Sequence, residues 1–125
     1  MVKAIRRLPD AELEVMQAVW SCTPPVARAD IEGVLGEDHP MAVTTILTLL
    51  ARLTQRGFLA ADKRGRNNYY TPLISQHEYL AAQSRRFFDK LCGGNLRTFA
   101  AALCDSGLSQ AEIDELRRLL ERGEL

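Results

Sequence analysis

Residues 61–70, ADKRGRNNYY, gather side chains whose types and spacing suit the binding of an anion. Three cations surround one glycine, and two asparagines and two tyrosines follow at once. Such groups hydrogen-bond to phosphate oxygens where proteins hold a nucleic-acid backbone. A charged turn that is only solvated is the alternative interpretation. The predicted backbone contacts are Lys63, Arg64, Arg66, Asn67, Asn68 and Tyr69.

A second polar set lies in segment 42–57, AVTTILTLLARLTQRG, whose apolar residues recur at helical spacing. Threonine offers a hydroxyl for hydrogen bonds and a methyl for contact with thymine, and arginine grips guanine or phosphate with two bonds. A threonine-rich face that is only solvated is the alternative. The apolar stripe consists of Val43, Ile46, Leu47, Leu50 and Leu53. The opposite side presents Gln55 and the four predicted base contacts, which are Thr44, Thr45, Thr48 and Arg52.

The chain as a whole offers no field that attracts nucleic acid or membrane, because 16 Lys and Arg balance 16 Asp and Glu. The distribution is uneven, since residues 40–72 carry five cations and one anion, a net charge of +4. Local charge is sufficient for phosphate contacts. Each such contact releases counterions and steepens the salt dependence of binding by about −0.9 in log–log slope.

Helical periodicity precedes the cationic turn, and strand-like segments flank it. Three helices are predicted, over residues 9–20, 27–35 and 42–57. Gly57 suits a left-handed cap at the end of the third. Segments 58–64 and 67–73 surround Gly65 and predict a β-hairpin. This order is typical of a winged helix-turn-helix, in which the third helix enters the major groove and the hairpin, or wing, reaches the flanking backbone.

Two domains follow, in a mainly α fold with a small β-hairpin wing. Residues 1–73 are predicted to form a winged helix-turn-helix DNA-binding domain. Residues 74–125 are predicted to form a C-terminal dimerisation domain of three helices, where capping boxes at Ser75 and Ser109 mark two helix starts.

The second domain carries more apolar surface than three short helices can bury by themselves. A second copy covers this surface and relates two reading helices by a two-fold axis, the geometry that a palindromic DNA site requires. In the alternative, these helices pack back onto the first domain of a monomer. The predicted dimer interface comprises Leu80, Phe87, Phe88, Leu91, Phe99, Leu103, Ile113, Leu116 and Leu120.

The sequence does not favour a secreted protein, a membrane protein, an enzyme or a metalloprotein. It shows no secretory signal and no run near the roughly 18 apolar residues of a membrane span, so we expect a cytoplasmic protein. No nucleophile elbow, Gly-rich phosphate loop, HExxH or paired-carboxylate motif supports an enzyme. Cys22, Cys92 and Cys104 lack metal-ligand or disulfide spacing, so we expect no metal or cofactor and expect these thiols to pack as small apolar side chains. A winged-helix module that binds an acidic protein instead of DNA is the alternative function.

Five stretches together carry a family resemblance. They are LPDAELEVMQAVW, TTILTLLARLTQRGFL, GRNNYYTPL, SQHEY and LSQAEIDELRRLL. They resemble the penicillinase-repressor (BlaI/MecI/CopY) transcriptional regulators over nearly the whole chain. The resemblance implies a homodimeric repressor with an N-terminal winged helix and an intertwined C-terminal dimer domain, bound to an operator with inverted half-sites. It gives base readout to the four residues of segment 42–57 named above, and backbone contact to Arg64, Arg66 and Tyr69.

Two stretches depart from the family pattern. The resemblance implies a sensor-controlled protease as a further partner, which cuts within the dimer domain, often at Asn-Phe. Here TFAAALCD presents Ala101 and Ala102 at the corresponding bond. The copper-responsive branch carries Cys-x-Cys near its C-terminus, and LLERGEL has none, so we expect no copper sensing through that motif.

Overall fold

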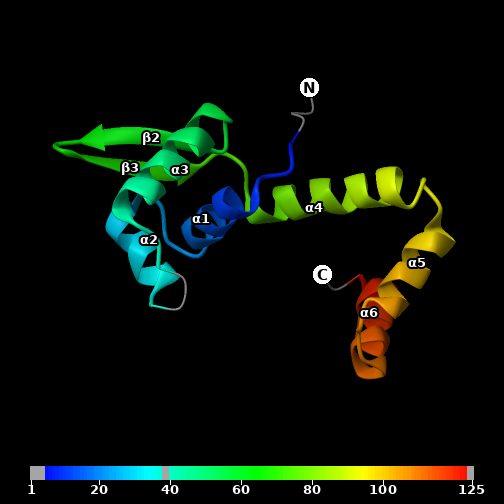
Figure 1. Ribbon diagram of the computed structural model, residues 1–125. Helices are drawn as coiled ribbons and strands as arrows, with labels where there is room; N and C mark the ends of the chain where they lie inside the picture. Colours follow the sequence, from blue (N-terminus) through cyan, green and yellow to red (C-terminus); the bar gives the residue numbers. More distant parts are fainter. Residues whose placement is uncertain (1–4, 38–39, 124–125) are drawn as a thin grey trace. The chain divides into compact units, whose positions relative to one another are not determined.

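The computed structural model describes residues 5–37 and 40–123 and is mainly α with a small antiparallel sheet, as predicted (Figure 1). The elements are α1 (Asp10–Trp20), β1 (Val26–Ala27), α2 (Arg28–Leu35), α3 (Val43–Gln55), β2 (Leu59–Arg64), β3 (Asn67–Pro72), α4 (Gln76–Arg86), the π-helical turn η1 (Phe87–Leu91), α5 (Leu96–Asp105) and α6 (Gln110–Arg122). The three N-terminal helices and the hairpin are confirmed. The sequence did not predict β1 or η1.

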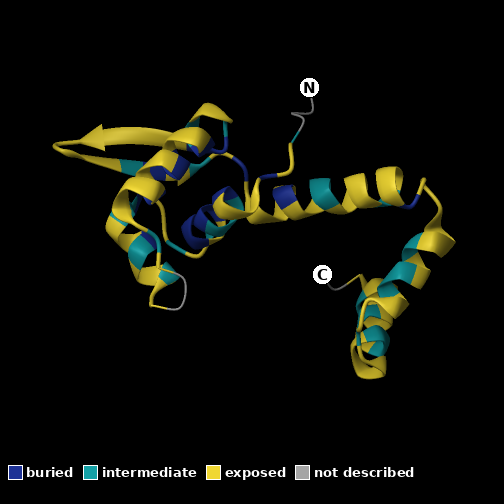
Figure 2. Cartoon of the chain, viewed as in Figure 1, coloured by how far each residue is buried: buried dark blue, intermediate teal, exposed yellow. Residues whose placement is uncertain are grey.

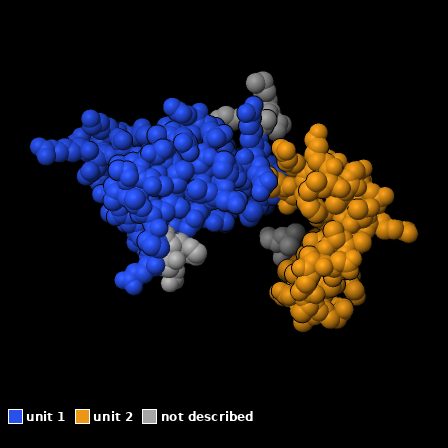
Figure 3. All heavy atoms as spheres, in the orientation of Figure 1, with its two compact units in different colours: residues 1–82 blue, residues 83–125 orange. Residues whose placement is uncertain are grey.

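The described residues pack into two compact units, one reaching to Ala82 and the other beginning at Gln83 (Figure 3). The first unit includes most of α4, whereas the domain boundary predicted from the sequence precedes this helix. The border between a DNA-binding domain and a dimerisation domain at residues 73 and 74 stays a prediction, because packing does not test the function of either part.

The core of the first unit lies between α1, α2, α3 and the sheet, and Figure 2 shows its buried residues in dark blue. On α3 the buried stripe is formed by Ile46, Leu49, Leu50 and Leu53. The predicted stripe was therefore partly wrong: Val43 and Leu47 are each 44% exposed, and Leu49 was omitted. Spacing alone could not separate these leucines, because α3 is apolar over more than one face.

A tight helix end fixes how the chain passes from α3 into the hairpin. The N–H of Phe58 donates to the carbonyl of Leu53 at 3.0 Å, and the N–H of Gly57 donates to Thr54 at 3.2 Å. These two bonds form a Schellman motif, which requires a left-handed residue after the helix. Gly57 has φ = 82°, so the predicted cap is confirmed, and Phe58 enters the core at 3% exposure.

The sheet has the order β1-β3-β2, and all its strands are antiparallel. Arg64 pairs with Asn67, so the hairpin turn consists of Gly65 and Arg66. Gly65 has φ = 65°, the sign that the first central residue of such a two-residue turn needs. On the other edge, β1 pairs with β3 and brings the start of α2 beside the hairpin.

Tyr79 attaches α4 to the first unit. Its side chain is 3% exposed, and its ring centroid lies 5.7 Å from that of Trp20 and 5.8 Å from that of Phe58. Its hydroxyl accepts a hydrogen bond from the N–H of Leu8 at 2.9 Å, and the indole N–H of Trp20 donates to the carbonyl of Ile74 at 2.9 Å. These contacts explain why packing joins the start of α4 to the rest of the first unit.

The second unit leaves its apolar side chains largely uncovered. Phe99 packs edge-on against Phe87 and Phe88, with ring centroids 5.8 and 5.7 Å apart. Yet none of the residues that the structure describes in α5 and α6 is fully buried. A unit of this length lies close to the limit of about 40 residues below which domains usually need oligomerisation or another stabilising device.

Both predicted capping boxes are present. Ser109 Oγ accepts from the N–H of Glu112 at 3.1 Å, and Glu112 accepts from the N–H of Ser109 at 2.8 Å. Ser75 and Glu78 form the same pair at 3.0 and 3.1 Å at the start of α4. The hydrogen bond from the backbone N–H of Ser109, and secondly that from its hydroxyl, lower the pKa of Glu112, and Ser75 lowers the pKa of Glu78 in the same way.

These lowered pKa values predict a loss of helix ends in acid. A carboxylate whose pKa is lower in the folded state stabilises it fully above the unfolded pKa, about 4.3 for Glu, and this stabilisation is lost as the pH falls through the folded pKa. A carbon-13 NMR titration of Glu112 is expected to give a pKa below the ordinary value of about 4.3 for a glutamate. Ser109→Ala is expected to raise the Glu112 value, and an unchanged titration would contradict the capping role.

Candidate nucleic-acid interface

The exposed side of α3 forms the first part of the candidate interface. Its hollow of about 290 Å³ is lined by Thr44, Thr45, Thr48, Leu49 and Arg52. The structure therefore brings together on one surface all four residues predicted to contact bases, and all four side chains are exposed. Within the described ranges, Arg52 has no salt bridge, so its guanidinium is available to an external acceptor.

The hydroxyl of Thr48 has a defined hydrogen-bonding role. It donates to the carbonyl of Thr44 at 2.9 Å, one turn earlier in α3. The hydroxyl proton is therefore used within the helix, and the oxygen keeps its capacity as an acceptor. In a major groove, Thr48 in this rotamer suits the amino group of adenine or cytosine, or the methyl group of thymine.

The two faces of the hairpin divide the predicted wing residues. Asp62, Arg64 and Tyr69 lie on one face, because side chains alternate along a strand. Arg64 Nε lies 3.0 Å from Asp62 Oδ2, and the guanidinium carbon lies 5.5 Å from the centroid of the Tyr69 ring. Both partners of this ion pair are more than half exposed, so the pair is weak and Arg64 can exchange Asp62 for a phosphate.

The opposite face of the hairpin carries Lys63 and Asn68, which pair across the strands, and Tyr70 further along β3. Arg66 lies in the turn between the strands. Lys63, Asn68 and Arg66 are all exposed. The six predicted contacts thus do not form a single row: one face offers Lys63 and Asn68, the other offers Arg64, Asn67 and Tyr69, and Arg66 lies in the turn.

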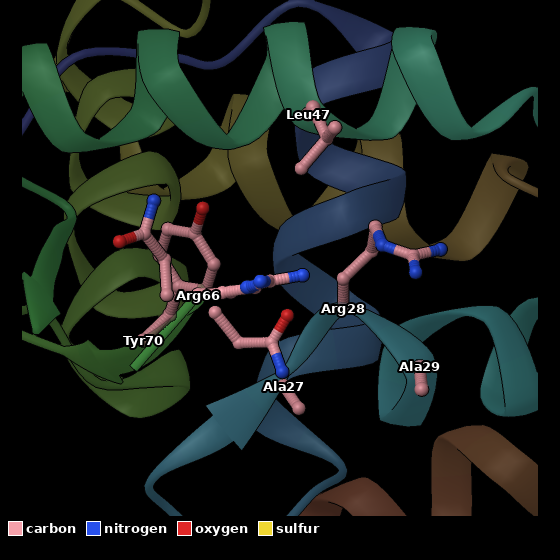
Figure 4. Close-up of a pocket in the computed structure, with 8 residues that line it drawn as sticks. Ala27, Arg28, Ala29, Leu47, Arg66 and Tyr70 are labelled. Atoms are coloured by element: carbon pink, nitrogen blue, oxygen red, sulfur yellow. The ribbon is translucent and has the colours of Figure 1, made fainter. Parts of the chain in front are cut away.

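The structure adds residues that sequence reasoning missed. Arg28, at the first position of α2, and Leu47 of α3 line a second hollow together with hairpin residues (Figure 4). Arg28 lies beside the hairpin because β1, which directly precedes it, pairs with β3. Strand β1 is only two residues long. So short a strand has no period that a sequence can reveal.

One cation of the positive segment, Arg56, pairs with a buried carboxylate of the first unit. Arg56 Nε lies 2.8 Å from Glu12 Oε1, and the Glu12 side chain is 2% exposed. Glu12 is buried in α1 among apolar residues, where an unpaired carboxylate is costly. Arg56 therefore neutralises a buried charge, and the positive field around α3 and the hairpin is smaller than the sequence count indicates.

The residues predicted for the dimer interface fall into two groups. Those with large exposed side chains are Leu80, Phe87, Leu91 and Leu120, at 54%, 38%, 76% and 63%. Those that are half-buried in the single chain are Phe88, Phe99, Leu103, Ile113 and Leu116. Leu96, the first residue of α5, is 71% exposed but was not among the predicted interface residues.

The cysteines occupy three different environments. Cys92 is buried and Cys22 is half-buried against the core, as predicted, but Cys104 is exposed on α5, so the prediction of a packed thiol was wrong there. Across residues 5–37 and 40–123, no three His, Cys, Asp or Glu side chains form a possible metal site. In the same part of the chain, no helix has the length and apolar character to cross a membrane.

Comparisons with known proteins agree with this architecture. The penicillinase repressor of Bacillus licheniformis is 32% identical over 121 residues, which cover 96% of this chain and 94% of that protein. The methicillin resistance regulatory protein MecI of Mammaliicoccus sciuri is 28% identical over 116 residues, which cover 92% and 94% of the two chains. The solution structure of the DNA binding domain of the repressor BlaI matches 63% of this chain and 94% of its own, with a TM-score of 0.52 and 34% identity. Because the family model described as Penicillinase repressor also matches residues 8–122, this chain belongs to the penicillinase repressor family.

Proposed function

We propose that this protein is a transcriptional repressor that binds operator DNA through α3 and the hairpin. The observation that carries this proposal is the exposed threonine and arginine face of α3, next to a hairpin whose cations are also exposed. Family membership and the similarity of the first unit to the DNA binding domain of BlaI support it. A repressor acts on chromosomal DNA, so we propose the cytoplasm as its location.

The proposal assigns different tasks to the two parts of the interface. Thr44, Thr45, Thr48 and Arg52 read base edges in the major groove, where threonine and arginine discriminate between base pairs. The hairpin residues hold the phosphate backbone, which fixes orientation without reading sequence. They are Lys63, Arg64, Arg66, Asn67, Asn68 and Tyr69.

We also propose that the repressor acts as a homodimer on an inverted-repeat operator. Support comes from the second unit, whose described residues in α5 and α6 include none that is fully buried. Large leucines at positions 91, 96 and 120 are more than half exposed. A second copy that covers them relates two α3 helices by a two-fold axis and matches the symmetry of a palindromic site.

Substitutions on the hairpin and on α3 are expected to have different effects on DNA binding. Arg66→Ala is expected to weaken binding about equally on all sequences and to reduce the salt slope by about 0.9, because it removes one phosphate contact. Thr48→Ala is expected to leave the slope unchanged and to reduce the preference for the cognate duplex. Fluorescence anisotropy measures the salt slope and the sequence preference of each variant. The cognate duplex is one that the wild-type protein selects from a random library, and the reference is a duplex of scrambled sequence.

The matched control is Arg118→Ala, which removes an exposed arginine from α6. It is expected to leave affinity and slope unchanged. DNA binding through the hairpin would be refuted if the affinity of the wild-type protein did not change with salt concentration. It would also be refuted if Arg66→Ala kept the wild-type affinity and slope. Salt-dependent binding to an acidic protein without binding to either duplex would favour a protein-contact module.

A further inference from the structure

A hollow between α2, α3 and the hairpin is bordered by two arginines. Arg28 comes from the first turn of α2, Leu47 from α3, and Arg66, Asn67 and Asn68 from the hairpin. The volume is about 360 Å³, roughly ten times the ~30 Å³ share of one water molecule in the liquid. In Figure 4 the guanidinium of Arg66 extends from the hairpin toward the side of the hollow where Arg28 stands.

Arg28 is held by one acidic neighbour. Its Nη1 hydrogen-bonds with Glu32 Oε1, one turn further along α2, and the two side chains are 37% and 36% exposed. Exposed pairs of this kind contribute little to stability. Arginine has five N–H donors in a planar fork, so most donors of Arg28 remain unused in this pair.

We propose that this hollow binds a phosphate of the DNA backbone, with Arg28 as a ligand and Glu32 as the counter-ion that the phosphate displaces. The inference rests on the proposed function and adds α2 to the DNA-binding surface. Guanidinium forks bind phosphate oxygens with paired hydrogen bonds, and the amides of Asn67 and Asn68 supply further donors. Among the described residues that line the hollow there is no carboxylate.

The position of the hollow favours duplex DNA over a small anion. It adjoins Leu47, which is exposed on the same helix that carries the proposed base contacts. A duplex that enters along α3 therefore brings its backbone past Arg28 and Arg66. Arg28 would then contribute to affinity on every sequence, because a phosphate contact carries no base information.

Glu32 gives the proposal a distinctive consequence. In the free protein its carboxylate accepts a hydrogen bond from Arg28. In the proposed complex with DNA the same carboxylate lies near a phosphate, which is also negatively charged. Both effects oppose DNA binding. Removing the charge of Glu32 should therefore tighten binding, and only while Arg28 is present.

The test measures binding of the full-length protein to a short random-sequence duplex between about 50 and 200 mM salt. Arg28→Ala is expected to weaken binding about tenfold, the loss of one charge-assisted contact, and to reduce the salt slope by about 0.9. Arg28→Lys is expected to keep the slope, because it keeps the charge. Glu32→Gln is expected to tighten binding by up to about fivefold, and Arg28→Ala/Glu32→Gln is expected to show no such gain.

A matched pair elsewhere in the chain serves as the control. Arg85 and Asp89 form another exposed i, i+4 ion pair, with Nε and Oδ2 3.0 Å apart, outside the hollow. Arg85→Ala and Asp89→Asn are expected to leave the slope unchanged. The fluorescence of Trp20 shows whether each variant keeps the fold of the first unit.

The outcomes separate this inference from the proposed function. If Arg66→Ala reduces the slope and Arg28→Ala does not, the hollow is not a phosphate site although the protein binds DNA. An equal gain from Glu32→Gln with and without Arg28 would also overturn the inference. If the wild-type protein shows no salt-dependent binding to any duplex, both proposals fail.

Discussion

Replacing Arg56 with alanine is expected to lower the free energy of unfolding of the first unit by about 3 kcal/mol. The reason is the buried Glu12 carboxylate, whose hydrogen bond to Arg56 Nε is 2.8 Å long. Removing one partner of a buried pair costs about 3 to 5 kcal/mol, because the other charge stays desolvated. We expect the lower end of this range, since the Arg56 side chain is 42% exposed and its loss admits water.

Urea unfolding followed by fluorescence measures this effect selectively. Trp20 is the single tryptophan of the chain and packs against Tyr79 in the first unit, so its emission reports that unit alone. Arg64→Ala is the matched control. It breaks an exposed ion pair of similar length and is expected to cost less than about 1 kcal/mol.

A second variant distinguishes the unpaired charge from lost packing. Glu12→Gln/Arg56→Ala leaves a neutral amide in place of the carboxylate, so we expect it to be more stable than Arg56→Ala alone by about 1 kcal/mol or more. If the double variant is no more stable, the loss in Arg56→Ala comes from the arginine stem and not from the buried charge. A single variant as stable as the wild type would show that Glu12 needs no partner.

Features encoded by neighbouring residues were predictable from the sequence. Gly57 and both capping boxes were predicted correctly, because each depends on a backbone or side-chain rule that acts within a few residues. The hairpin was predicted for the same reason, since a glycine at positive φ between two strand-like segments specifies a tight turn.

Features that depend on distant pairs were not predictable. Glu12 and Arg56 are 44 positions apart, and nothing in the local pattern of α1 marks a buried carboxylate. Strand β1 has only two residues, and it forms because these residues pair with Tyr70 and Tyr69 of β3. Long-range packing decides both.

The candidate site shows the same division. Its residues on α3 were predicted together because they share one helix face, and the structure brings them to one hollow. Arg28 was missed, because it reaches the hairpin only through the pairing of β1 with β3. On α3, the predicted core positions of Val43 and Leu47 were wrong, because both side chains are exposed, and Leu47 lines the second hollow.

Dissociation of the proposed homodimer is expected when a charge replaces one of the exposed leucines of the second unit. Leu91→Asp and Leu120→Asp change side chains that are 76% and 63% exposed in the single chain, so they cost the protomer little. In the proposed dimer each buries an unpaired carboxylate in both copies. At about 3 kcal/mol per charge, the dissociation constant rises about 10⁴-fold.

Sedimentation velocity over a range of protein concentrations measures the change in mass, and anisotropy measures its effect on DNA. The variants are expected to sediment as monomers, to bind a half-site as the wild type does, and to lose the added affinity for the full inverted repeat, because the two reading units are no longer linked. The control Leu73→Asp changes a leucine of the first unit that is 53% exposed and is expected to remain dimeric. Wild-type mass in both Leu91→Asp and Leu120→Asp would refute an interface at these leucines, and a monomeric wild-type protein would favour packing of the C-terminal helices onto their own chain.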